Sequence, residues 1–171
     1  MHRNVMYMAA AILSTTLAAA VPADTALTLP ALFSDHAVLQ RDVAIPVWGW
    51  TEPQEEVVVS IEGHKCRTKA DDSGNWRVEL PPMQAGGPYT LRIDAGVESR
   101  TIEDVYTGEV WICSGQSNMQ MTVGDCGGIE GGTDIANQDK IRFFRVHSKS
   151  VPEPSRECRG QWTLATSDTV D

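Results

Sequence analysis

A serine at position 117 is the residue of this sequence whose surroundings are best suited to chemistry. It follows a short apolar run, residues 110–113 (VWIC), and a small-residue corner made by Ser114 and Gly115. A serine at the tip of a tight turn above a sheet can face an acyl carbon with its hydroxyl, while its own backbone N–H faces the developing oxyanion. The pattern therefore indicates nucleophilic attack on an acyl group. A serine that only caps a turn or a helix fits the same spacing.

A nucleophilic serine needs a general base, and histidine is the usual one near neutral pH. The sequence has four histidines. His2 lies in an N-terminal segment that we expect to be removed, and His64 lies in a hairpin turn that we expect to be exposed. His36 is predicted to be a hydrogen-bonded structural residue. His147 follows the apolar stretch IRFFRV and is kept as a base candidate, although no acidic partner is visible beside it.

Two long motifs resemble the sialate O-acetylesterase family, a branch of the SGNH hydrolases. Residues 108–121 (GEVWICSGQSNMQM) resemble the nucleophile block of that family, and residues 29–53 (LPALFSDHAVLQRDVAIPVWGWTEP) resemble the start of its N-terminal β domain. The stretch GNWRVELPPMQAGGPYTLRI and the closing GQW also fit. The resemblance implies hydrolysis of O-acetyl esters on sugars, notably sialic acids, with no metal and no organic cofactor.

Position by position, the resemblance implies that Ser117 is the nucleophile and that its backbone N–H is one donor of the oxyanion hole. Gly115, Gln116 and Asn118 match the rest of the motif and are expected to shape the turn. The family pattern also contains a glycine and an asparagine that complete the oxyanion hole, and an Asp-x-x-His pair that supplies the base. None of these can be assigned in this chain. Because the serine hydroxyl stays protonated without a base, we expect the chain alone to have little or no activity.

The sequence divides into three parts. Residues 1–23 have a short basic start, an apolar stretch and small residues before Asp24, which is typical of a secretory signal peptide and predicts export to a periplasm or to the medium. Residues 24–106 contain short alternating segments separated by turns, which predict an antiparallel, jelly-roll-like β-sandwich. The family resemblance implies that residues 107–171 begin an α/β, flavodoxin-like hydrolase domain.

Alternation of apolar and polar residues assigns an inward face to each strand of the predicted sandwich. Pro46 indicates an edge strand or a bend, and the DDSGN stretch around Gly74 predicts a tight turn. The predicted inward-facing residues are Val43, Ile45, Val47, Val57, Val59, Ile61, Cys66, Thr68, Ala70, Trp76, Val78, Leu80, Tyr89, Leu91 and Ile93.

In the third part, the apolar run at residues 110–113 does not alternate, which favours a strand covered on both faces. Residues 141–146 (IRFFRV) predict a second strand, and residues 160–162 (GQW) a small structural corner. A βαβ unit needs roughly 30 residues or more, so this part has room for about two such units. The hydrolase domain is therefore expected to be incomplete, and the chain to be the N-terminal piece of a longer protein.

The net charge of the chain argues against some kinds of partner, and its cysteines argue against a zinc site. With 14 basic and 23 acidic side chains the formal net charge is −9. Phosphate backbones would repel such a chain, so nucleic acid is not an expected partner. The expected partner is the acetylated sugar or glycan that the resemblance implies, and no membrane is expected after signal cleavage.

The four cysteines include no CxxC pair, which argues against a zinc site. The sequence leaves three full pairings of the four cysteines open. Cys113 is expected to be a buried free thiol, and Cys126–Cys158 is the preferred single bridge.

The main alternative is a non-catalytic carbohydrate-binding β-sandwich module. Trp48 and Trp50 share one face of their predicted strand and could stack on a sugar, whereas Trp76 alternates with Val78 and Leu80 and is expected in the core. Glycan binding that survives Ser117→Ala and is lost in Trp48→Ala would favour this alternative. No sequence feature supports a purely structural or interaction domain.

Overall fold

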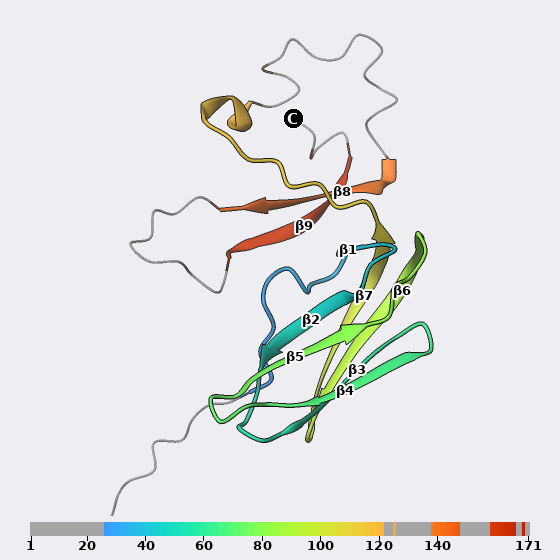
Figure 1. Ribbon diagram of the computed structural model, residues 1–171. Helices are drawn as coiled ribbons and strands as arrows, with labels where there is room; N and C mark the ends of the chain where they lie inside the picture. The colour runs from blue at the N-terminus through green and yellow to red at the C-terminus, as the bar shows by residue number, and fades with distance from the viewer. Residues whose placement is uncertain (1–25, 122–124, 126–137, 148–157, 167–168, 170–171) are drawn as a thin grey trace, which may run out of the picture.

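The computed structural model describes residues 26–121, 125, 138–147, 158–166 and 169, and the chain is built from strands and one short helical turn over these residues (Figure 1). The prediction of a mainly β fold is confirmed. No helix within these ranges is long and apolar enough to cross a membrane. The elements are β1 (Val38–Gln40), β2 (Ile45–Trp50), β3 (Glu56–Ile61), β4 (His64–Lys69), β5 (Asn75–Leu80), β6 (Gly86–Ala95), β7 (Glu98–Gly108), the 3₁₀ turn η1 (Ser117–Gln120), β8 (Gln138–Val146) and β9 (Gly160–Ala165).

The strands form a five-stranded sheet in the order β1-β7-β6-β3-β4 and two two-stranded sheets, β2-β5 and β8-β9. The neighbours pair antiparallel except for β1 and β7, which run parallel. The prediction of a wholly antiparallel arrangement is therefore wrong at this one pair. Two parallel strands need a long connection, and the many residues between β1 and β7 provide one, so the parallel pairing introduces no strain.

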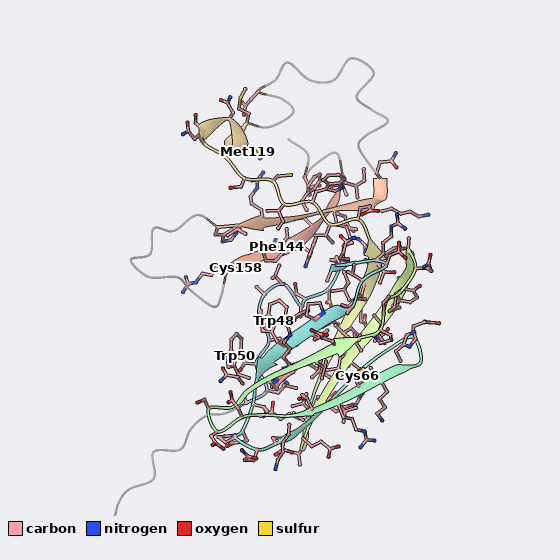
Figure 2. All side chains as sticks on the ribbon, in the orientation of Figure 1. Trp48, Trp50, Cys66, Met119, Phe144 and Cys158 are labelled. Atoms are coloured by element: carbon pink, nitrogen blue, oxygen red, sulfur yellow. The ribbon has the colours of Figure 1, made fainter. Side chains whose placement is uncertain are left out.

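One hydrophobic core lies between the five-stranded sheet and the β2-β5 ribbon (Figures 1 and 2). Its most buried side chains include Val59 of β3, Ile93 of β6 and Val47 of β2, all with no exposed surface. The inward faces predicted by alternation are confirmed for β2, β3, β5 and β6, with the exception of Val43, which precedes β2 and is exposed. The jelly-roll topology stays a prediction.

The predictions for the DDSGN turn and for Pro46 are confirmed by the backbone. Gly74 has a φ of +79°, and a Cβ at this position would collide with the Thr51 carbonyl oxygen, so glycine is required. The Asp71 carboxylate accepts the N–H groups of Ser73 and Asn75 at 2.8 and 2.9 Å, which is the local bonding expected of this turn. Pro46 lies in β2, whose only strand partner among the described elements is β5, so it occupies an edge strand.

Beyond Gly108 the structure differs from the expectation at residues 110–113. They form no strand, and Trp111 and Ile112 are 81 and 93 % exposed. Cys113 is exposed rather than buried. An apolar strand of this kind needs neighbours on both edges and cover on both faces, and no described element pairs with it. The prediction of a covered strand is therefore wrong for this chain.

Strand β8 contains the predicted stretch IRFFRV, but GQW begins β9 rather than forming a corner. Gly160 is needed there because a Cβ would come within 2.7 Å of the Phe144 ring. Trp162 then pairs across the strands with Phe144, with ring centroids 5.4 Å apart. Since the described residues after Gly108 contain neither a parallel pair nor an α-helix, the flavodoxin-like start of a hydrolase domain stays a prediction.

Two further predictions concern residues that the structure does not describe. The signal peptide at residues 1–23 lies outside the described residues, and so does Cys126. Cys158 is a free thiol, so the favoured Cys126–Cys158 disulfide is not formed.

Candidate active site

Ser117 is exposed and is the first residue of the turn η1. Within the turn, the N–H of Met119 donates to the Gln116 carbonyl at 2.9 Å and the N–H of Met121 to the Asn118 carbonyl at 3.3 Å. The first N–H groups of a helical turn have no partner inside it. Ser117 thus has an accessible hydroxyl and an amide that the turn itself does not use, although no covered strand leads up to it.

The residues around Ser117 give the turn its shape. A Cβ on Gly115 would come within 2.8 Å of the Met119 Cγ atom, so the lack of a side chain lets the turn fold back at this point. Gln116 precedes the turn in an extended conformation and makes no side-chain capping bond. The backbone carbonyl groups of Gln116 and Asn118 accept the two hydrogen bonds of the turn. The turn-shaping and catalytic roles of these residues stay predictions.

His36 is the structural residue that the sequence predicts. Its Nδ1 lies 2.6 Å from Oδ2 of Asp104, and the same oxygen accepts a hydrogen bond from Arg142 at 2.8 Å. An aspartate that orients a histidine is also a catalytic arrangement, but here the carboxylate is shared with a buried guanidinium. None of the hydrogen bonds described for this pair involves Ser117.

The other two described histidines lie at strand ends. His64 is exposed, as predicted, but it begins β4 directly after the hairpin turn rather than lying in the turn. His147 is exposed, and its N–H donates to the Arg159 carbonyl at 2.8 Å, one step past the end of β8. No hydrogen bond in the described ranges links either histidine to Ser117. The described part of the chain therefore supplies the turn and its serine, and none of its histidines is hydrogen-bonded to that serine.

A polar clamp that the sequence analysis missed holds the chain where it leaves β7. Arg41 donates from Nε to Glu109 at 2.8 Å, and Gln40 accepts the N–H of Val110 on its Oε1 at 2.9 Å. The hydrogen bond from Arg41, followed by that from Gln40, lowers the pKa of the Glu109 carboxyl. The only sequence signal was the long motif at residues 29–53, which contains Gln40 and Arg41 without indicating their partners.

Comparison with known proteins gives consistent matches, although no family model matches the chain. Sialate O-acetylesterases of Pongo abelii and Homo sapiens are each 30 % identical over 154 residues, which is 80 % of this chain and 29 % of the relative. A solved carbohydrate acetylesterase from Xanthomonas citri is 37 % identical with a TM-score of 0.78, covering 84 % of this chain and 34 % of that one. The matched residues belong to the sialate O-acetylesterase family. The resemblance predicted from the two motifs is thereby confirmed.

The sialate O-acetylesterases matched here are much longer than this chain, which spans less than a third of the length of the two relatives. The match covers most of this chain, and therefore extends well beyond the nucleophile block. Identity at this level establishes the family but assigns no role to an individual residue. The roles of Ser117, Gly115, Gln116 and Asn118 remain predictions for this sialate O-acetylesterase-type chain.

The tryptophans of the alternative, sugar-binding interpretation have partners within the chain. Trp48 meets the ring of Phe33 edge-on at 4.9 Å and packs against the core, and Trp50 donates its Nε1–H to Asn75 at 3.1 Å (Figure 2). Trp76 is 3 % exposed, as predicted. Trp48 and Trp50 share one face of β2, as predicted, and both are half-buried.

A shallow groove of about 430 Å³ lies among the strands before Gly108, between residues 27–35 and β7. Leu27 and Ile102, which are almost fully buried, are among its lining residues. Ser117 does not line it. No group of three or more potential metal ligands occurs within the described ranges.

Proposed function

We propose that the protein to which this chain belongs hydrolyses acetyl esters on sugars, with Ser117 as the nucleophile. The observation that carries the proposal is the exposed serine at the first position of a tight turn, in a chain of the sialate O-acetylesterase family. The names of the matched proteins support an acetylated carbohydrate as the substrate class. Which sugar carries the ester is left open, since acetyl groups on sialic acids and on other glycans are equivalent at the reacting carbonyl.

In the proposed reaction, the Ser117 hydroxyl oxygen attacks the acetyl carbon and gives its proton to a general base. The backbone N–H of Ser117 donates to the carbonyl oxygen as that oxygen becomes negatively charged. The C–O bond to the sugar then breaks, and the sugar leaves with the proton while the acetyl group stays on Ser117. Water attacks this ester in a second step, which releases acetate and restores the serine.

We propose further that the base comes from polypeptide outside this chain, so that the chain acts as part of a longer, exported protein. Two observations support this. No histidine is hydrogen-bonded to Ser117 among the described residues, and the apolar residues Trp111 and Ile112 lie exposed directly before it. Additional chain that covers these side chains could also carry the base. Relatives about three times as long have room for such a segment.

The test is turnover of an aryl acetate and of an O-acetylated sugar by the longer protein and by the chain alone. In the longer protein, we expect Ser117→Ala to lower kcat by on the order of 10³-fold or more. Ser114→Ala is the matched control, since Ser114 is also exposed and lies three residues away, and it should leave kcat within about threefold. The chain alone should show no turnover above that of buffer.

Turnover by the longer protein that Ser117→Ala leaves intact would refute Ser117 as the nucleophile. Turnover by the chain alone that Ser117→Ala abolishes would refute the external base. Glycan binding without any turnover would favour the carbohydrate-binding module instead.

A further inference from the structure

Residues 32–42, which we call the hub, contact several parts of the chain that are distant in sequence. The hub contains β1 and lies within the first of the two family motifs. Hydrogen bonds join it to the chain leaving β7, to the Asp104 carboxylate that holds β8, and to β9, where Trp162 donates its Nε1–H to the Leu32 carbonyl at 2.9 Å. These contacts place the hub between the strands before Gly108 and the residues that follow it.

On one side, the hub prolongs the β1–β7 pairing beyond the end of β1. The N–H of Arg41 donates to the Gly108 carbonyl at 3.1 Å, which is the last backbone bond of this pair. Gln40 then accepts the N–H of Val110 on its side chain, so an amide oxygen replaces the backbone carbonyl that a longer strand would have offered. The direction of the chain is thereby fixed as far as Val110, seven residues before Ser117.

On the other side, an ion pair between Arg142 of β8 and Asp104 of β7 holds the β8–β9 sheet next to the hub. The Arg142 side chain is 2 % exposed and donates to the Asp104 carbonyl at 3.0 Å and to its carboxylate at 2.8 Å. Its guanidinium lies 4.1 Å from the centre of the Tyr106 ring, and His36 contacts the same carboxylate oxygen. A buried charge that loses its partner is strongly destabilising, so this contact is a stronger anchor than the exposed pair of Arg41 and Glu109.

We propose that the hub is a positioning element for the reaction. Gln40 orients the segment that carries Ser117, and Arg142, acting through Asp104, anchors the β8–β9 sheet on the same support, and neither side chain touches the substrate. This inference rests on the function proposed above. The inference gives the first family motif a physical role that its sequence does not reveal. The motif attaches the β strands before Gly108 to the segment that contains Ser117.

Amide hydrogen exchange on the chain itself tests the hub without any assay of activity. Gln40→Ala should speed exchange of the Val110 amide about tenfold, and Arg142→Ala should speed exchange in β8 and β9 about tenfold or more, with β3 and β6 unchanged. Arg142→Lys keeps the charge but not the planar set of donors, so its exchange rates in β8 and β9 should lie between those of the unmodified chain and those of Arg142→Ala. It serves as the second variant if Arg142→Ala does not fold. Arg67→Ala, at an exposed pair between β3 and β4, is the matched control and should change none of these amides.

Unchanged exchange of Val110 in Gln40→Ala would overturn the role of the hub in orienting the segment before Ser117. Unchanged exchange of β8 and β9 in both Arg142 variants would overturn the anchor at Asp104. In the longer protein, Gln40→Ala should lower kcat about tenfold and leave KM within about twofold, because it moves the serine and not the sugar-binding groups. Gln161→Ala, at an exposed position in β9, is the control and should leave both unchanged. If turnover depends on Ser117 and Gln40→Ala leaves kcat unchanged, the positioning role fails and the proposed function stands. If the longer protein has no turnover, the proposed function fails and the exchange data alone decide whether the hub fixes these segments.

Discussion

The strands before Gly108 and the residues after it place apolar side chains in opposite environments. The first region, residues 26–108, buries its apolar faces between two sheets and exposes only Val43 and Val97 among its large hydrophobic residues. Every other exposed large hydrophobic side chain that is described lies after Gly108: Val110, Trp111, Ile112, Met119, Met121, Ile141, Phe143 and Val146. The first region therefore buries nearly all of its large apolar side chains. The second region leaves most of its large apolar side chains exposed to solvent among the described residues.

This difference shows that the same kind of residue has a different energetic role in the two regions. In the first, burial of apolar surface stabilises the fold by about 25 cal/mol for each Å². In the second, Phe144 and Trp162 pack against each other, but the exposed apolar side chains named above bury little surface against the described residues. Exposed clusters of this kind commonly mark a surface that something else covers. The contrast supports the proposal that Ser117 functions within a longer polypeptide.

The largest effect that tests the comparison comes from truncating one isoleucine in each region. Ile93 has no exposed surface and Ile112 is 93 % exposed. Ile93→Ala should lower the free energy of unfolding by about 2–5 kcal/mol, because it leaves a cavity in the core. Ile112→Ala should change it by less than about 0.5 kcal/mol. Urea unfolding of the chain measures both, and a cost above about 1 kcal/mol for Ile112→Ala would show that this segment is packed.

An intermediate effect is expected at the contact between the two regions. Asp104 has a φ of +55°, which asparagine tolerates, so Asp104→Asn tests the charge with little backbone strain. It should destabilise the chain by about 1–3 kcal/mol, because Arg142 is then buried without a carboxylate. Asp72→Asn, at an exposed aspartate, should cost less than about 0.5 kcal/mol. Equal costs for the two variants would mean that the ion pair does not couple the regions.

The smallest effect concerns the exposed clamp. The Arg41 guanidinium holds the pKa of the Glu109 carboxyl below its usual range, so the clamp should be intact at neutral pH and should be lost as pH falls through this lowered pKa. Arg41→Ala should raise the pKa of Glu109 toward that of a free glutamate, and Arg67→Ala should leave it unchanged. NMR titration of the Glu109 carboxyl measures this. A midpoint that does not move in Arg41→Ala would show that the clamp is not formed in solution.

Sequence reasoning succeeded where structure depends on neighbours along the chain. Alternation in β3 and β5 predicted which residues are buried, since each strand is joined to its partner or flanked by a short turn, and Gly74 marked one such turn. His36 was correctly predicted to be structural. The run at residues 110–113 was misread because its apolar residues indicate that cover is needed and not whether this chain provides it.

The contacts that sequence reasoning missed join residues far apart in the chain. Gln40 meets Val110 and Arg142 meets Asp104 through single side chains, across 70 and 38 residues respectively, and no local pattern marks such pairs. The same holds for GQW, where only the structure shows that Gly160 lets β9 approach the Phe144 ring. Ser117 was found because its motif is local, whereas its base was not, because a catalytic base is set beside the serine by the fold and not by sequence spacing.

The most direct test of the account is covalent labelling by a fluorophosphonate, which reacts with a serine only when a base activates it. The longer protein should be labelled at Ser117, as mass spectrometry of the peptide would show, and the label should be lost in Ser117→Ala and kept in Ser114→Ala. The 171-residue chain alone should remain unlabelled. Labelling of the longer protein at a different serine, or of the chain alone at Ser117, would contradict the account.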